Sequence, residues 1–158
     1  KSIIYTDPLK AKEFVQKSGC DFLAVAIGTS HGAYKFSSQA KLNINLLKEI
    51  KKKTNLPLVL HGASGVPFAI VQIAQKYGAK LSGVKGVPDY QISQAIKYGI
   101  NKVNTDTDLR IAFDAGVRKA IQEHPEDFDP RHILSPAREL ITKVVEQRIR
   151  LFGSKGKA

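Results

Sequence analysis

Apolar residues along this chain form two alternating patterns, which predict strands and helices in turn. Continuous apolar runs at 22–27 and 56–60, and a shorter one at 100–104, are typical of strands buried on both faces. Between and after these runs, apolar residues recur at helical spacing, and prolines and glycines mark the helix ends. The predicted helices cover 9–18, 43–54, 67–77, 89–98, a long segment capped by 105–108 and ending at 122, and 136–152, with a short turn at 125–129.

Strands that alternate with helices of this length predict parallel β/α units. Three strands are too few to close a barrel, but they match the final units of an eight-stranded (β/α)₈ TIM barrel, a fold of roughly 250 residues. The 158 residues include no methionine, so no initiator is present. We therefore expect residues 1–158 to be the C-terminal part of a single TIM-barrel domain, whose N-terminal half is not in this chain.

The composition excludes several classes of protein. Apolar residues make up 42% and charged residues 25%, as in ordinary globular proteins, and no apolar run approaches the ~20 residues that cross a bilayer. The single cysteine leaves no intramolecular disulfide, which makes a reducing cytoplasm the default location. The net charge is +11, but the lysines are scattered or lie on predicted helix faces without interleaved aromatics. We therefore expect no nucleic-acid partner, whereas a positive field suits small phosphorylated substrates.

Polar residues follow each predicted strand, and two of these segments carry a histidine directly before a glycine. The pairs are His31-Gly32 and His61-Gly62, and the third segment is the Asn-Thr-Asp-Thr-Asp run at 104–108. Active sites of parallel β/α folds form at the carboxyl ends of the strands. Histidine is the commonest neutral metal ligand, and loops of small residues expose groups that suit phosphate. The residues alone therefore predict a phosphate-handling metal barrel, one ligand short of the three that a catalytic zinc usually takes.

The remaining two histidines, His124 and His132, lie in a charged helical stretch and are assigned to the surface.

Three segments together resemble class II fructose-bisphosphate aldolases: 26–32, 58–65 and 104–113, within a similarity that runs from 5–8 to the Leu-Phe-Gly-Ser end. The resemblance implies a homodimeric or homotetrameric (β/α)₈ barrel with one zinc ion on three histidines. Such a lyase reversibly cleaves fructose 1,6-bisphosphate to dihydroxyacetone phosphate and glyceraldehyde 3-phosphate, in glycolysis and gluconeogenesis. His31 and His61 would be zinc ligands, and the third histidine and the general acid/base aspartate would lie outside this chain.

The resemblance also assigns the substrate contacts. Asn104 would hydrogen-bond the enediolate end of the substrate, and Lys35 is a weaker candidate for a phosphate contact. Arg110 would reach the second phosphate across the dimer, while Arg131 would help from its own subunit. The residues implied around the phosphate of dihydroxyacetone phosphate are Gly32, Gly62, Ser64, Asp106 and Thr107. Backbone near Gly32 and Ser64 would also hold a monovalent cation, Na⁺ or K⁺.

Two alternatives stay open. Tagatose-1,6-bisphosphate aldolases are similar, but they generally carry alanine where Asp106 stands, which favours fructose. A remoter possibility is a basic, non-catalytic barrel that binds phosphate or RNA without a metal.

Overall fold

The protein is an α/β structure built on a three-stranded parallel sheet. The computed structural model describes residues 4–29 and 40–157. The strands are β1 (Leu23–Val25), β2 (Leu58–Leu60) and β3 (Ile100–Val103), in the order β1-β2-β3. The register pairs Val25 with Leu60 and Leu60 with Val103, so all three carboxyl ends lie at one edge. A bulge at β3 leaves Asn101 unmatched, and its Oδ1 accepts the N–H of Leu58.

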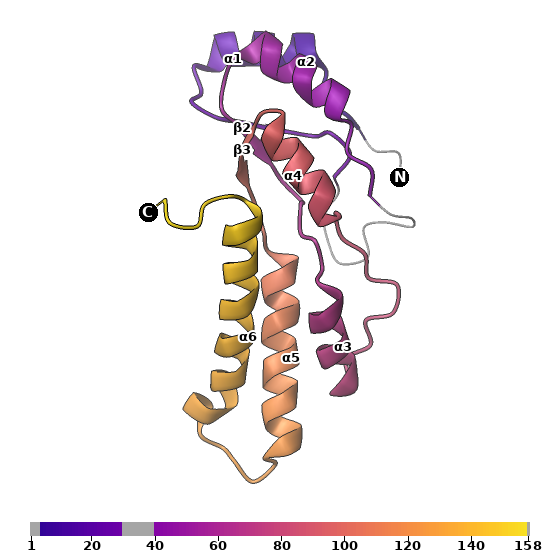
Figure 1. Ribbon diagram of the computed structural model, residues 1–158, viewed down its shortest axis with the longest axis vertical. Helices are drawn as coiled ribbons and strands as arrows, with labels where there is room; N and C mark the ends of the chain where they lie inside the picture. Colours follow the sequence, from indigo (N-terminus) through magenta and orange to yellow (C-terminus); the bar gives the residue numbers. More distant parts are fainter. Residues whose placement is uncertain (1–3, 30–39, 158) are drawn as a thin grey trace.

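Helices connect the strands and cover the sheet, as parallel pairing requires. Helix α1 (Pro8–Ser18) precedes β1, α2 (Ile44–Thr54) joins β1 to β2, and α4 (Asp89–Lys97) leads into β3. In the upper half of the molecule, α1 and α2 lie above the strands and α4 lies beside them (Figure 1). Their shared apolar core includes Val25, Ile27, Leu47, Ile50, Leu58, Leu60, Ile92 and Ile100.

A second layer of helices extends from the carboxyl edge of the sheet. Helices α5 (Thr107–Glu123) and α6 (Pro130–Leu151) run side by side as a hairpin, and α3 (Phe68–Lys76) packs against α5 (Figure 1). This layer has its own core, which includes Ile70, Val71, Ala74, Ile111, Ala112, Ala115 and Val144. The described residues therefore form two cores, which meet in the loop after β2, since Ala63 belongs to the first and Val66 to the second.

The helix boundaries follow local capping chemistry, and one predicted boundary is wrong. Asp7 caps α1 by accepting the N–H groups of Leu9 and Lys10, as the Asp-Pro start predicts. Helix α6 was expected to begin at Pro136, but it begins at Pro130. Its cap repeats the Asp-Pro signal of α1, because Asp129 accepts the N–H of Arg131. Pro136 thus lies inside α6, although proline usually interrupts a helix interior.

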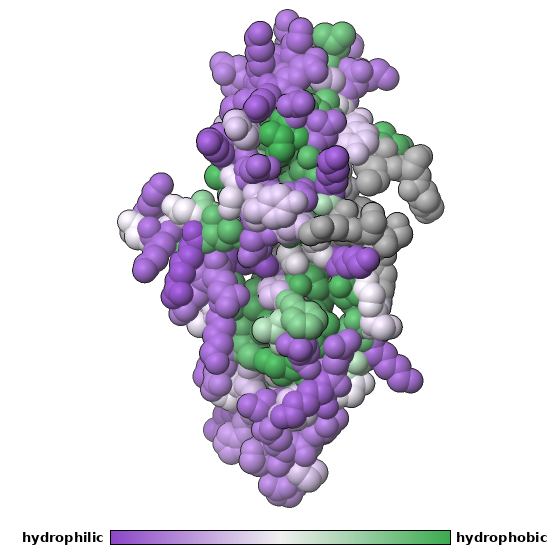
Figure 2. Space-filling view, turned by 45° about the vertical axis from the view of Figure 1, so that its right-hand side comes forward, coloured by the Kyte–Doolittle hydropathy of each residue, from purple (hydrophilic) through white to green (hydrophobic). Residues whose placement is uncertain are grey.

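The surface is largely polar. Figure 2 shows hydrophilic residues over both ends of the molecule and a hydrophobic area between them. Within the described ranges, no helix is long and apolar enough to span a membrane. In the lysine run of α2, Lys52 and Lys53 are exposed, as predicted for a solvated helix face, whereas Lys51 donates to the carbonyl of Leu56.

The contact between α5 and α6 can be tested at Gly116. A Cβ added there would lie 2.3 Å from Cα of Ala137 on α6. In an open helix, Gly→Ala gains about 1 kcal/mol. We expect Gly116→Ala instead to lower the free energy of unfolding by about 1–3 kcal/mol, because the two helices must separate. Urea unfolding measures this change, with Ser93→Ala on the exposed side of α4 as the control. A stabilised Gly116→Ala variant would contradict the close packing.

Candidate functional site

The carboxyl ends of β2 and β3 place His61 and Asn104 side by side at the edge of the sheet. Leu60 and Val103 are paired in register, and the N–H of Asn104 donates to the carbonyl of Leu60 at 3.0 Å. His61 is exposed, and Asn104 Oδ1 accepts from Lys102 Nζ at 2.6 Å. Parallel pairing therefore brings these two residues to the same level of the sheet edge.

The end of β1 leads to a segment that lies outside the described residues. His31, Gly32 and Lys35, three of the predicted site residues, fall in 30–39. The chain leaves the sheet at Gly28, which has φ +120°, and an added Cβ there would lie 2.4 Å from the carbonyl oxygen of Lys41. The two flanks of 30–39 therefore meet at the carboxyl edge of the sheet.

Buried Gln91 of α4 holds the returning flank of that segment. Its Oε1 accepts the N–H of Leu42 at 2.7 Å, and its Nε2 donates to the carbonyl of Ala40 at 2.7 Å. The N–H of Asn43 also donates to the carbonyl of Ile27 at 2.7 Å. The position at which the chain re-enters the fold is thus fixed by three hydrogen bonds.

Ser64 joins the loop after β2 to the start of α5. The side chain is buried, and its hydroxyl oxygen accepts the N–H groups of Asp106 and Thr107 at 3.3 and 3.2 Å. Asp106 occupies the cap position, but its carboxylate makes no cap hydrogen bond and instead accepts from Arg110 Nε at 2.9 Å. Three of the residues predicted to surround a phosphate are therefore in contact, beside a helix N-terminus whose dipole favours anions.

The backbone of this loop has an unusual shape that its neighbours hold. Val66 has φ +52°, which costs a β-branched residue about 1–3 kcal/mol. The carboxylate of Asp108 accepts the N–H of Val66 at 2.7 Å and that of Gly65 at 3.3 Å. On the other side, the N–H of Val87 donates to the carbonyl of Ser64 at 3.0 Å.

A buried ion-pair network holds the backbone of the loop at Gly65 and Val66. Asp108 is fully buried and pairs with Arg148, whose Nε lies 2.9 Å from Asp108 Oδ2. The same guanidinium reaches Asp89 at the start of α4, with Nη1 2.6 Å from Oδ1. The loop and three helices (α4, α5 and α6) therefore meet at this network.

The sequence alone did not predict this network. Asp108 was placed in a helix cap, and Arg148 stood among the many charges of the terminal helix. The available signal was periodicity, because Ala137, Val144 and Arg148 share the buried face of α6 at helical spacing. The sequence also did not single out Thr105, whose buried hydroxyl has no hydrogen-bond partner in the structure described here.

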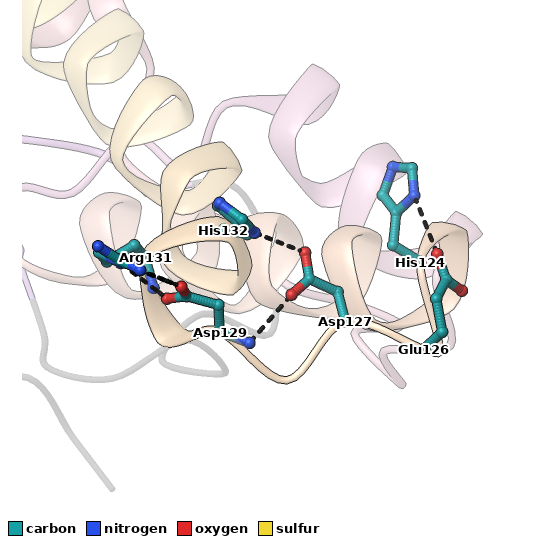
Figure 3. A network of polar contacts seen from close by, with 6 residues as sticks. All are labelled: His124, Glu126, Asp127, Asp129, Arg131 and His132. Atoms are coloured by element: carbon teal, nitrogen blue, oxygen red, sulfur yellow. Dashed lines mark hydrogen bonds and ion pairs between the residues drawn. The ribbon is translucent and has the colours of Figure 1, made fainter.

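The two predicted phosphate arginines lie at opposite ends of α5. Arg110 is exposed beside Asp106. Arg131 begins α6, beyond the other end of a 17-residue helix about 25 Å long. There its hydrogen bonds to Asp129 raise the pKa of the guanidinium and lower the pKa of the carboxyl (Figure 3). Within one chain, Arg131 is therefore not brought together with Ser64 and Asp106.

The hairpin tip also carries the two histidines assigned to the surface, and that assignment is confirmed. His132 Nδ1 lies 2.9 Å from Asp127, and His124 Nδ1 lies 3.9 Å from Glu126, with all but Asp127 exposed (Figure 3).

A metal ion at the strand ends would have to draw on other ligands. Among the described residues, no group of three or more His, Cys, Asp or Glu side chains could hold a metal. Of the two predicted zinc ligands, only His61 is described. Its position at an open strand end suits a ligand of a catalytic site, which needs further ligands from elsewhere.

Comparison with known proteins defines the class to which this fold and site belong. Residues 1–157 match the family model "Fructose-bisphosphate aldolase class-II", so the chain belongs to that family. It is 48% identical over 157 residues to a fructose-bisphosphate aldolase of Helicobacter pylori, covering 99% of this chain and 51% of the relative. It is also 46% identical over 158 residues to that of Thermus caldophilus, covering 100% and 52%. The chain thus spans about half the length of these relatives.

Solved structures agree with the fold. The chain is similar to the YdjI aldolase from Escherichia coli K12, with a TM-score of 0.71 and 36% identity, over 98% of this chain and 48% of that one. A structure from Coccidioides immitis matches with a TM-score of 0.67 and 24% identity, over 98% and 45%, which supports the fold alone.

The hydroxyl of Ser64 offers a direct test of this site. Ser64→Ala removes the acceptor of two N–H groups, and we expect it to cost about 1 kcal/mol of stability, as for other lost helix caps. Amide hydrogen exchange of Asp106 and Thr107 should accelerate, with Ser82→Ala in an exposed loop as the control. Unchanged protection of both amides would show that Ser64 does not cap α5.

Proposed function

We propose that the polypeptide carrying this chain is a zinc-dependent class II fructose-bisphosphate aldolase. It would reversibly cleave fructose 1,6-bisphosphate to dihydroxyacetone phosphate and glyceraldehyde 3-phosphate. Family membership supports this activity. The observation that best supports it is the contact of Ser64, in the loop after His61, with the N-terminus of α5. Asn104 lies next to His61 at the same edge of the sheet.

The complete fold would be a (β/α)₈ barrel, to which residues 1–158 contribute part of a single domain. Three adjacent parallel strands in sequential order, with their carboxyl ends at one edge, are what consecutive barrel units present. Polar residues gather at that same edge, where barrel enzymes carry their active sites.

His61 and His31 would be two of three zinc ligands, and the third histidine and the general acid/base aspartate would come from outside these residues. When bound, zinc supplies a Lewis acid that polarises the substrate carbonyl. The side-chain amide of Asn104, directly after β3 and next to His61 at the sheet edge, would donate a hydrogen bond at the reacting end of the substrate.

The substrate phosphate would be held by the loop after β2 and the start of α5. Gly62, Ser64, Asp106 and Thr107 line this junction, and Gly32 and Lys35 would approach from the segment after β1. Repulsion between Asp106 and a phosphate would be offset by Arg110, which already pairs with that carboxylate. A Na⁺ or K⁺ ion near Gly32 and Ser64 would add positive charge, since the Ser64 carbonyl keeps a second lone pair beside its bond to Val87.

The finer assignments concern specificity, assembly and location. Asp106 favours fructose over tagatose 1,6-bisphosphate, and relative cleavage rates of the two sugars would decide between them. The exposed side chain of Arg110 is free to serve a homodimer or homotetramer by reaching a neighbouring subunit's substrate. The family's activity and the single cysteine support a cytoplasmic location.

Metal removal tests the activity itself. In the full-length polypeptide, EDTA should abolish cleavage of fructose 1,6-bisphosphate, and added Zn²⁺ should restore it. His61→Ala should lose bound zinc and at least a thousandfold of kcat, whereas exposed His124→Ala should retain both. Cleavage that survives thorough chelation would reject the zinc mechanism. Phosphate binding without cleavage would instead favour the non-catalytic barrel.

Arg110 tests the contact with the second phosphate. We expect Arg110→Ala to raise KM for fructose 1,6-bisphosphate about tenfold or more, since a charge-assisted contact to phosphate is worth roughly 1.5–3 kcal/mol. The matched control is Arg118→Ala on the same helix, because Arg118 also pairs with an aspartate four residues earlier. Equal KM values for the two variants would remove Arg110 from the substrate site.

A further inference from the structure

We propose that Arg148, on the C-terminal helix, is a positioning residue for the phosphate site. It acts through Asp108, which holds the backbone of the loop between His61 and α3. The inference builds on the proposed function, because it assumes that this loop receives a substrate phosphate.

The first step is the carboxylate of Asp108. Its side chain has no exposed surface, and its two oxygens accept the N–H groups of Val66 and Gly65. A buried carboxylate is stable only when its charge is paired and its oxygens are hydrogen-bonded. The only basic group that an ion pair gives it among the described residues is Arg148.

The second step is the fit of the guanidinium. Arg148 is only 7% exposed, and its two nitrogens Nε and Nη1 point to different carboxylates, Asp108 on α5 and Asp89 on α4. The third nitrogen lies over Gly65, where an added Cβ would be 2.6 Å from Nη2. A planar fork can make these three contacts at once, whereas a lysine ammonium cannot.

The third step is the loop that these contacts hold. The positive φ of Val66 is strained and persists only where its surroundings hold it, and its N–H donates to Asp108 at 2.7 Å. Ser64, two residues earlier, caps α5 at the predicted phosphate site. Loss of the Arg148 charge would therefore release the loop and misplace the phosphate-binding groups, although Arg148 itself is buried beneath the loop rather than exposed at the site.

The experiment compares Arg148→Met with Arg150→Met in the full-length polypeptide. Arg150 is the matched control, because it lies two residues away on α6 and pairs with Glu146 at an exposed position. The readouts are the Kd for inorganic phosphate, KM and kcat for fructose 1,6-bisphosphate, zinc content and the unfolding midpoint. We expect Arg148→Met to weaken phosphate binding and raise KM about tenfold, with zinc content and kcat changed less than threefold. Arg150→Met should leave all of them unchanged.

A double variant separates positioning from stability. In Asp108→Asn/Arg148→Met no unpaired buried charge remains, so the unfolding midpoint should recover. The amide offers only one acceptor oxygen for the two N–H groups of Gly65 and Val66, so phosphate binding should stay weak. The phosphate affinity of Arg148→Lys should fall between that of the wild type and that of Arg148→Met.

Recovery of both stability and phosphate affinity in the double variant would overturn the proposal, as would an Arg148→Met variant with the phosphate affinity of Arg150→Met. Absence of phosphate binding in the wild type would overturn it too. A wild type that binds phosphate without cleaving the bisphosphate, together with weakened binding in Arg148→Met, would reject the aldolase activity and keep the positioning role.

Discussion

The buried ion pair between Asp108 and Arg148 is the interaction on which the two halves of this structure depend. One core surrounds the parallel sheet and the other fills the space between α3, α5 and α6. The pair lies where they meet, and Asp89 ties α4 to the same guanidinium. Such a pair adds little net stability compared with apolar packing, but breaking it leaves a buried charge. Its main effect is therefore to determine how the helical layer meets the edge of the sheet.

The polar residues of the candidate site lie at the same edge, and the reason is geometric. Parallel pairing brings the residues that follow β2 and β3 to one level, so His61 and Asn104 become neighbours although they are far apart in sequence. The loop after His61 then turns back to cap α5 through Ser64. The residues proposed to contact metal, substrate and phosphate, His61, Asn104 and Ser64, are thus brought together at one edge by strand pairing and by the Ser64 cap.

The sequence predicted most of the fold because strands and helices here follow local rules. The three apolar runs contain the three strands, and the cap at Asp7 lies where expected. The start of α6 was predicted at Pro136, but the Asp129 cap, which repeats the Asp-Pro signal of α1, places it at Pro130. Single polar positions at strand ends could be predicted, since strand direction alone brings them together. The Asp108–Arg148 pair could not, because it joins residues 40 positions apart and depends on how α6 packs.

The hydrogen bonds that Gln91 makes to Ala40 and Leu42 have a consequence for how this protein can change in evolution. The flank that follows segment 30–39 is held by two hydrogen bonds from Gln91 of α4 and by the backbone bond from Asn43 to Ile27. The entropic cost of closing a loop grows only with the logarithm of its length, so residues added between fixed anchors cost little. The length of the chain between these flanks could therefore change among descendants, while the scaffold that aligns the strand ends is inherited intact.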